Sequence, residues 1–387
     1  MNKWCLVVAV GVSGPVFAAA DLLYDFGSQY RSPKSSSTNP ALLFNCEDQI
    51  STGFAVQKTQ FSLEGDRAQQ AGDNRLGVDF GLCKALLPYV SVGLHVNANA
   101  LSFGFETQNQ AEPIVFPYGQ QSLPISSGGI AVKITEPFAV GFAWKLVEKV
   151  AVDARVPVDN FALQAQVDVD IRPSASWLLG ASYVHDAWEI HYSYSPELRG
   201  DLELDVELPV QLGGLGFTAG LLNLQSALSY IPARNQLGLL GQYRDLSYDI
   251  GIVQNQWSKF DAPFLEVNVL ANLDSLLFEQ SQVTFRTTYE PYAIFGATVA
   301  PQWEAKLGYA YRPSPVKAGG STGSVVGADL HSFKAAVEHR LEILDRTLLL
   351  GADLTYGLIT GIEQGQSNDA IDGWFYYLQT SLRLPLS

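Results

Sequence analysis

Residues 90–100 read VSVGLHVNANA and decide the fold class. Apolar residues in this stretch alternate strictly with small polar ones: Val90, Val92, Leu94, Val96, Ala98 and Ala100 against Ser91, Gly93, His95, Asn97 and Asn99. Successive side chains of a β-strand point to opposite faces, so the pattern places the apolar set on one face and the polar set on the other. The stretch is therefore predicted as a half-apolar strand.

The same period of two recurs along the chain on both sides of this stretch. It is clear at residues 138–146, 161–171 and 202–210, and similar runs continue to residue 384. Together they predict roughly 14 to 16 strands, most of them long enough to cross a bilayer when tilted, which takes about 9–11 residues. The Gly- and Leu-rich segment 213–228 is the exception and is predicted as a helix or an outer loop.

The polar face of these strands favours a membrane barrel over a soluble sandwich. It consists mainly of Gly, Ala, Ser, Asn and Gln with scattered charges, whereas the outer face of a soluble sandwich normally carries many charges. Short connections alternate with longer polar ones near residues 106–127 and 313–329, as in outer-membrane barrels. Tryptophans fall in or at the ends of the runs, as aromatic girdles require: Trp144, Trp177, Trp188, Trp257, Trp303 and Trp374. The predicted class is an all-β, transmembrane antiparallel β-barrel.

Composition and charge exclude several other classes. The 387 residues include 24 Lys plus Arg against 39 Asp plus Glu, a formal net charge of −15. Nucleic-acid binders need a basic footprint, so nucleic acid is not an expected partner. The chain is 47% hydrophobic and 11% aromatic, which argues against disorder. No apolar run of about 18 residues follows the first 20, which argues against a helical membrane protein.

The N-terminus predicts export. Lys3 precedes an apolar stretch, and small residues end at Ala20, so residues 1–20 are predicted to be a signal peptide cleaved near Ala20. A short membrane anchor is the alternative, although the apolar stretch is too short to span a bilayer. Removing Lys3 with the signal leaves 23 basic and 39 acidic residues, a charge of −16.

Two cysteines remain in the mature chain, Cys46 and Cys83. The compartment beyond the inner membrane is oxidising, so we expect them to form a disulfide, with two unpaired buried thiols as the alternative. Neither lies in a CxxC motif or a Cys/His metal spacing, so the sequence predicts no metal and no cofactor.

No catalytic motif is apparent, and the chain is predicted not to be an enzyme. The five histidines are scattered among the strands, and none belongs to an H-E-x-x-H motif or lies beside a G-x-S-x-G motif. A barrel-wall hydrolase built on His331, Ser332 and His339 is a less favoured alternative.

Several stretches resemble the FadL/TodX family of outer-membrane transporters for hydrophobic compounds. Residues 289–316, YEPYAIFGATVAPQWEAKLGYAYRPSPV, are similar to a strand pair of that family, and residues 232–260 resemble a second block that ends in WSKF. Asn39, Pro40 and Ala41 match the N-P-A with which the family's N-terminal hatch leads into the first strand. The order and spacing of these stretches carry the resemblance over most of the mature chain.

The resemblance implies a barrel of about 14 strands over residues 45–387, with residues 21–44 as a hatch that plugs the lumen. It implies passive uptake of hydrophobic small molecules, long-chain fatty acids or hydrocarbons, with lateral release into the bilayer. The implied partners are outer-membrane lipid, lipopolysaccharide and the barrel-assembly machinery. A general porin and a structural outer-membrane barrel are the alternatives.

The negative charge of the chain bears on the cargo. An anionic fatty acid would need a local cation, and three cations fall on the inward parity of their predicted strands: Lys145, Lys306 and Arg312. If these side chains point outward instead, a neutral hydrocarbon becomes the better cargo.

Overall fold

The computed structural model describes residues 32–46, 48–64, 69–102, 125–147, 150–158, 163–171, 174–212, 215–259, 266–268, 284–317, 328–343, 346–361 and 370–386. The predicted signal peptide and residues 21–31 of the predicted hatch lie outside these ranges. Among the described residues, no helix has both the length and the apolar character needed to cross a membrane.

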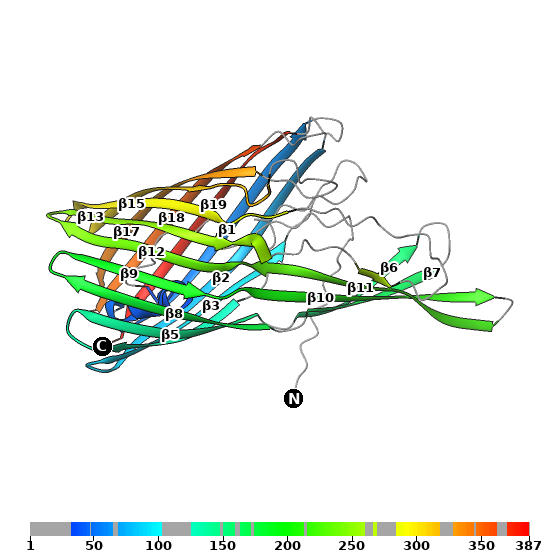
Figure 1. Cartoon of the computed structure of the whole chain (residues 1–387), viewed down its shortest axis with the longest axis horizontal. Coiled ribbons are helices and arrows are strands. Elements are labelled where there is room, and N and C mark those ends of the chain that lie inside the picture. Colours follow the sequence, from blue (N-terminus) through cyan, green and yellow to red (C-terminus); the bar gives the residue numbers. More distant parts are fainter. Residues whose placement is uncertain are drawn as a thin grey trace.

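Fourteen antiparallel strands form a closed barrel (Figure 1). The first and last strands complete it, with pairs from Gln49↔Pro385 to Glu64↔Ala370. This confirms the predicted fold class. The wall strands are β1 (Gln49–Glu64), β2 (Gln69–Leu87), β3 (Val90–Ser102), β4 (Ile125–Lys133), β5 (Phe138–Val147), β8 (Ser174–His185), β9 (Trp188–Ser195), β12 (Ala233–Tyr243), β13 (Leu246–Gln256), β15 (Thr288–Ala300), β16 (Trp303–Arg312), β17 (Ala328–Ile343), β18 (Arg346–Gly361) and β19 (Ala370–Pro385).

The period of two separates an apolar outer face from a polar inner face. In β5, Phe142 and Trp144 are exposed, while Ala143 and Lys145 between and beyond them are buried. The same rule places polar side chains inside the barrel on nearly every strand: Asp79, His95, Ser127, Ser182, Glu189, Gln236, Asn255, Glu290, Arg312 and Gln379 are all buried. An apolar exterior with a polar interior is typical of outer-membrane barrels.

The two ends of the barrel differ in their connections. At one end, here called the short-turn end, the described connections are brief: residues 88–89, 134–137, 186–187, 244–245 and 301–302. Two of these turns contain a residue with positive φ, Asp186 at 47° and Arg244 at 57°, as tight hairpins require. β1 begins and β19 ends at this end too. The opposite end, here called the long-connection end, carries all the longer connections.

A second sheet extends beyond the long-connection end (Figure 1). It has five strands in the order β14-β11-β10-β7-β6. They are β6 (Val150–Val158), β7 (Leu163–Ile171), β10 (Leu198–Leu212), β11 (Leu215–Ile231) and β14 (Glu266–Asn268). A single-turn 3₁₀ helix, η3 (Trp257–Lys259), follows β13.

This sheet corrects two expectations. The runs predicted at 161–171 and 202–210 contain β7 and part of β10, and these strands belong to the second sheet and not to the wall. Alternation along a strand indicates its two faces but does not identify its neighbours. The helix or loop predicted for 213–228 is wrong, since residues 215–231 form β11. Its pairing with β10 over most of its length overrides the local Gly/Leu pattern.

The described part of the predicted hatch contains two short helices inside the barrel. These are α1 (Ser35–Thr38) and the 3₁₀ helix η1 (Pro40–Asn45), which contact β3, β4 and β5, and η1 also contacts β8 and β9. Figure 1 shows them in blue within the barrel, toward the end where the C-terminus lies.

Candidate functional site

Residues 32–46, here called the lumen segment, pack tightly against one half of the inner wall. Asn39, Ala41, Leu42 and Leu43 are completely buried. The wall presents glycines where the segment approaches most closely, and a Cβ on any of them would overlap it: Gly93 meets Leu43, Gly141 meets Pro40 and Ala41, and Gly180 meets Asn39. The wall of β3, β5 and β8 therefore holds a fitted track for the segment.

The N-P-A motif shapes the segment where it lies on this track. The Asn39 side chain accepts a hydrogen bond from the backbone N–H of Ala41 (3.1 Å) and so caps η1, and Pro40 occupies the first helical position. The Asn39 Nδ2 also donates to the backbone carbonyl of Tyr192 in β9 (3.1 Å). One extended asparagine thus separates α1 from η1, starts η1 and ties it to the wall.

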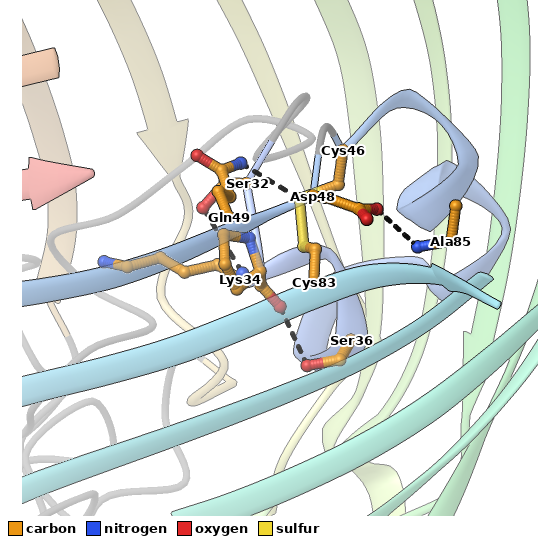
Figure 2. The surroundings of a disulfide bond; sticks show 9 residues. Ser32, Lys34, Ser36, Cys46, Asp48, Gln49, Cys83 and Ala85 are labelled. Atoms are coloured by element: carbon orange, nitrogen blue, oxygen red, sulfur yellow. Dashed lines mark hydrogen bonds between the residues drawn. A yellow bond between two sulfur atoms is a disulfide. The ribbon is translucent and has the colours of Figure 1, made fainter. Parts of the chain in front are cut away.

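The C-terminal end of the lumen segment is joined covalently to the barrel. Cys46 and Cys83 form a disulfide with their Cα atoms 6.2 Å apart, which links the segment to β2 (Figure 2). Next to it, Asp48 accepts a hydrogen bond from the backbone N–H of Ala85 (2.6 Å). Asn45 donates to both carboxylate oxygens of Glu189 in β9 (2.9 and 3.2 Å).

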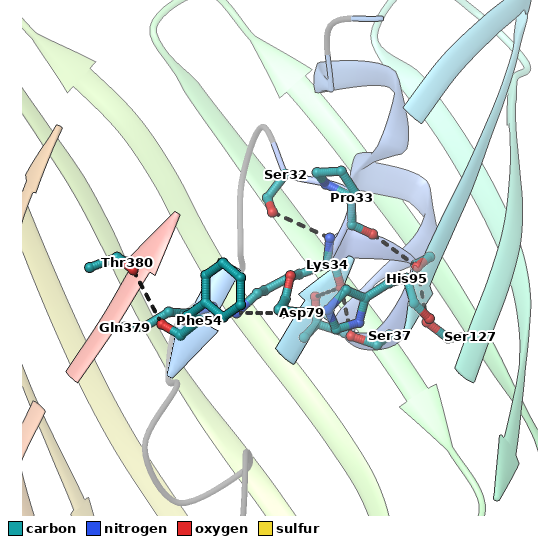
Figure 3. A network of polar contacts seen from close by, with 12 residues as sticks. Ser32, Pro33, Lys34, Ser37, Phe54, Asp79, His95, Ser127, Gln379 and Thr380 are labelled. Carbon is teal, nitrogen blue, oxygen red and sulfur yellow. Dashed lines mark hydrogen bonds and ion pairs between the residues drawn. The ribbon is translucent and has the colours of Figure 1, made fainter. Parts of the chain in front are cut away.

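The other end of the lumen segment is held by charge. Lys34 Nζ lies 3.2 Å from an Asp79 carboxylate oxygen in β2 and donates to the Gln379 side chain in β19 (3.1 Å). His95 Nε2 lies 2.9 Å from the same Asp79 oxygen (Figure 3). Asp79 therefore connects the lumen segment, β2 and β3 through one buried carboxylate.

A cavity of about 790 Å³ occupies the other half of the lumen, toward the short-turn end. Most of its lining comes from β12, β13 and β15 to β19, and β1, β8 and β9 contribute a few residues more. Ser32, Lys34 and Asp79 lie along its border with the lumen segment. We call it the charged cavity because ionisable side chains line it: Lys34, Asp79, Glu189, Asp249, Glu304, Lys306, Lys334, Glu338, Arg340, Asp353 and Arg383. Arg383 pairs with Glu338.

Three cations lie inside the barrel nearer the long-connection end and form what we call the cationic group: Lys145, Arg234 and Arg312. Arg312 Nε pairs with Glu290 (3.2 Å), and Asn255 donates to the same carboxylate (2.6 Å). Arg234 donates to the Gln236 side chain (3.3 Å), while its charge repels that of Lys145. Within the described ranges, no carboxylate pairs with Lys145.

The structure separates the three cations that the sequence singled out. Lys145 and Arg312 are both buried and both lie near Arg234, whereas Lys306 is 40% exposed, pairs with Glu304 (3.3 Å) and borders the charged cavity. Sequence reasoning missed Arg234. The alternation could have predicted that Arg234 faces inward, because in the run that begins after Pro232 it has the same parity as Gln236 and Leu240.

The residues of the alternative hydrolase site do not come together. Ser332 is fully buried on the inner face, whereas His331, its neighbour in β17, points to the other face and contacts the Tyr309 hydroxyl (2.8 Å). His339 stacks on Trp303, with ring centroids 4.0 Å apart. Among the described residues, no group of three or more His, Cys, Asp or Glu side chains could hold a metal ion.

Comparison with known proteins agrees with this architecture. No protein-family model matches the chain, and no curated protein matches it. A Pseudomonas aeruginosa FadL homologue of known structure superimposes with a TM-score of 0.65 at 15% identity, covering 98% of this chain and 100% of its own.

Two hydrocarbon channels are also similar. The CymD monoaromatic hydrocarbon channel has a TM-score of 0.61 at 14% identity, covering 95% of this chain and 99% of its own. The Pseudomonas putida toluene transporter TodX has a TM-score of 0.59 at 14% identity, covering 94% and 99%. The chain therefore has the fold of the FadL/TodX barrels.

Proposed function

We propose that this protein is an outer-membrane channel for passive uptake of hydrophobic molecules that carry a carboxylate, such as long-chain fatty acids. The fold, the apolar outer face and the predicted signal peptide with cleavage near Ala20 support this proposal. Solved structures with this fold include a FadL homologue, a monoaromatic hydrocarbon channel and a toluene transporter. Lipopolysaccharide and the barrel-assembly machinery are the partners expected at that location.

The cationic group is the observation that favours a carboxylate over a neutral hydrocarbon. Lys145, Arg234 and Arg312 face inward with Glu290 as the carboxylate among them, in a chain whose net charge is −15. One carboxylate for three inward-facing cations leaves positive charge uncompensated, which is costly in a buried site, and a bound carboxylate would supply charge-assisted hydrogen bonds. A channel for toluene alone would gain nothing from these charges.

Residues 21–44 are proposed to act as the hatch. The described part of this segment lies on a fitted track inside the barrel and is bonded to it at both ends. A general porin needs an open lumen, so a segment packed this closely against the wall favours a plugged channel.

Lateral release of cargo is supported by the charged cavity. An alkyl chain that continued straight toward the short-turn end would enter a space lined by ionised groups, and displacing their water without new hydrogen bonds is costly. Exit through the wall into lipid avoids that cost, because the bilayer interior is itself apolar.

Uptake of two cargoes tests the proposal. Lys145→Met combined with Arg234→Met should reduce oleate uptake about tenfold, because a hydrogen bond to a charged group contributes about 1.5–3 kcal/mol. Toluene uptake in the same cells should not change. Lys306→Met removes an inward-facing charge outside the cationic group and should affect neither cargo.

Two outcomes would contradict the proposal. Unchanged oleate uptake in the double variant would assign the channel to neutral hydrocarbons. Absence of uptake of both cargoes by the wild-type protein, with a folded barrel in the outer membrane, would leave a structural role.

A further inference from the structure

A row of hydrogen-bonded polar side chains crosses four neighbouring strands of the wall. The Tyr192 hydroxyl in β9 donates to the Asn235 side-chain oxygen in β12 (2.7 Å), and the Asn235 amide donates to Gln254 in β13 (2.9 Å). The Gln254 amide in turn donates to the Tyr289 hydroxyl in β15 (3.0 Å). We call these four residues the outer ladder.

The outer ladder faces away from the lumen. Tyr192 is 44% exposed and Tyr289 is 54% exposed, although each lies between two buried chain neighbours. Asn235 and Gln254 have the same outward parity, because the residue after Asn235 and both neighbours of Gln254 are buried. The next outward residues toward the short-turn end are apolar and exposed: Ile190, Leu237 and Ile252.

The height of the outer ladder places it at the edge of the apolar band. Short turns of an outer-membrane barrel face the periplasm, so the long-connection end faces outward. Asn235 and Tyr243, the last residue of β12, are eight positions apart. This separation corresponds to about 26 Å of strand, or about 20 Å of height at a tilt of about 40°, whereas the apolar band is about 25 Å tall. The outer ladder therefore lies where the headgroups of the outer leaflet begin.

The hydrogen bonds of the outer ladder all run in one direction, which leaves capacity for a ligand. Tyr192 only donates, so its oxygen can accept, and Tyr289 only accepts, so its hydroxyl proton can be donated. Each amide between them keeps one N–H and one oxygen lone pair. Among the described residues, no other side chain bonds to these groups.

The wall around the outer ladder carries no charge on its outward side. The outward positions within 190–194, 233–239, 250–256 and 289–295 hold only aliphatic, aromatic, amide and proline side chains. A phosphate would find no cation there, whereas hydroxyl and amide groups can both donate to and accept from the outer ladder.

We propose that the outer ladder binds the sugar headgroup of an outer-leaflet glycolipid through its hydroxyl and amide groups. Four strands span about 14 Å at a spacing of about 4.8 Å, a length that suits two linked sugar rings better than the small headgroup of a phospholipid. The exposed aliphatic side chains beside the outer ladder then contact the acyl chains. This inference rests on the proposed outer-membrane location and not on the cargo.

Native mass spectrometry of the purified mature protein with added lipid A tests the site. Asn235→Leu combined with Gln254→Leu should weaken lipid A binding about tenfold, because leucine cannot make the hydrogen bonds. Lipid A that has lost one phosphate should bind the wild type as well as intact lipid A does. Gln60→Leu is the matched control, since it removes an exposed outward glutamine from β1, which is not one of the four strands, and it should leave binding unchanged.

Four outcomes would overturn the site. They are lipid A binding by the folded double variant at the wild-type level, an equal loss in Gln60→Leu, loss of wild-type binding when one phosphate is removed, and a wild-type dimer that the double variant turns into a monomer. The last would make the outer ladder an interface between two copies. A change in electrophoretic mobility on boiling shows that each variant is folded.

Two further measurements separate failure of the site from failure of the proposed function. Oleate uptake by the double variant should match that of the wild type, because the outer ladder lies outside the lumen. Recovery of the wild type in the outer-membrane fraction checks its location without reference to lipid A.

Discussion

The two halves of the lumen are built on opposite principles. Along β3, β4, β5 and β8, the wall offers glycines and alanines, and the lumen segment fills the space until its core residues are fully buried. Along β12 to β19, the wall offers ionised side chains around a cavity of about 790 Å³. Small residues allow the backbone of the lumen segment to approach the backbone of the wall, whereas charged side chains retain water. One half of the lumen therefore holds the fitted track with its segment, and the other half holds the charged cavity.

The largest expected effect comes from removing the N-terminal part of the lumen segment. Deleting residues 21–38 should leave a folded barrel that admits small polar solutes and takes up hydrophobic cargo less efficiently, because α1 then no longer fills the lumen beside β3, β4 and β5. Liposome swelling with small sugars and cellular uptake of oleate measure the two changes. Unchanged values of both would mean that the filled half does not limit passage.

A smaller effect is expected from removing the disulfide that joins the lumen segment to β2. Replacing both Cys46 and Cys83 with Ser should lower the free energy of unfolding by about 2–4 kcal/mol on the chain-entropy estimate for a loop of this length. The two residues are 37 positions apart. Urea unfolding in lipid vesicles, compared with the reduced wild type, checks it; equal stability of the oxidised wild type and the variant would show that close packing alone fixes this end.

The smallest expected effect is on stability, when a wall glycine is replaced by alanine in one half of the lumen or in the other. Gly141→Ala should destabilise the protein by about 1–3 kcal/mol, because the new methyl group meets the backbone of Pro40 and Ala41. Gly296→Ala is the control in the charged half, where the nearest atoms to the methyl group belong to the side chains of Ser247, Lys306 and Glu304 and not to the backbone. Thermal unfolding measures both, and equal losses would mean that the two halves do not differ in rigidity.

Local alternation explains why the sequence predicts the wall so well. Parity along a single strand is enough to place Lys145 and Arg312 inside, and the structure has both buried. Parity does not say which strands are neighbours. The strands at 163–171 and 198–212 leave the barrel for a second sheet, and only their pairing with each other reveals it.

The site depends on contacts that are distant in sequence, and this limits its prediction. The N-P-A motif at 39–41 is recognisable in the sequence. The track that holds it is made by glycines far along the chain, and nothing in the sequence distinguishes them from other strand glycines. Arg234 joins the cationic group only because β12 follows β9 around the barrel, although the two strands are separated in sequence by β10 and β11. The charged cavity has no sequence signature, since it collects residues from more than seven strands.

The closing seam between β1 and β19 sets an order for assembly. Each residue of β1 pairs with a residue of β19, so this seam cannot form until β19 has been exported. The bridge between Cys46 and Cys83 encloses the β1–β2 hairpin and needs nothing beyond residue 83. The disulfide can therefore form first and give the newly exported chain a cross-linked hairpin. The free edge of β1 in this hairpin is then the template with which β19 pairs.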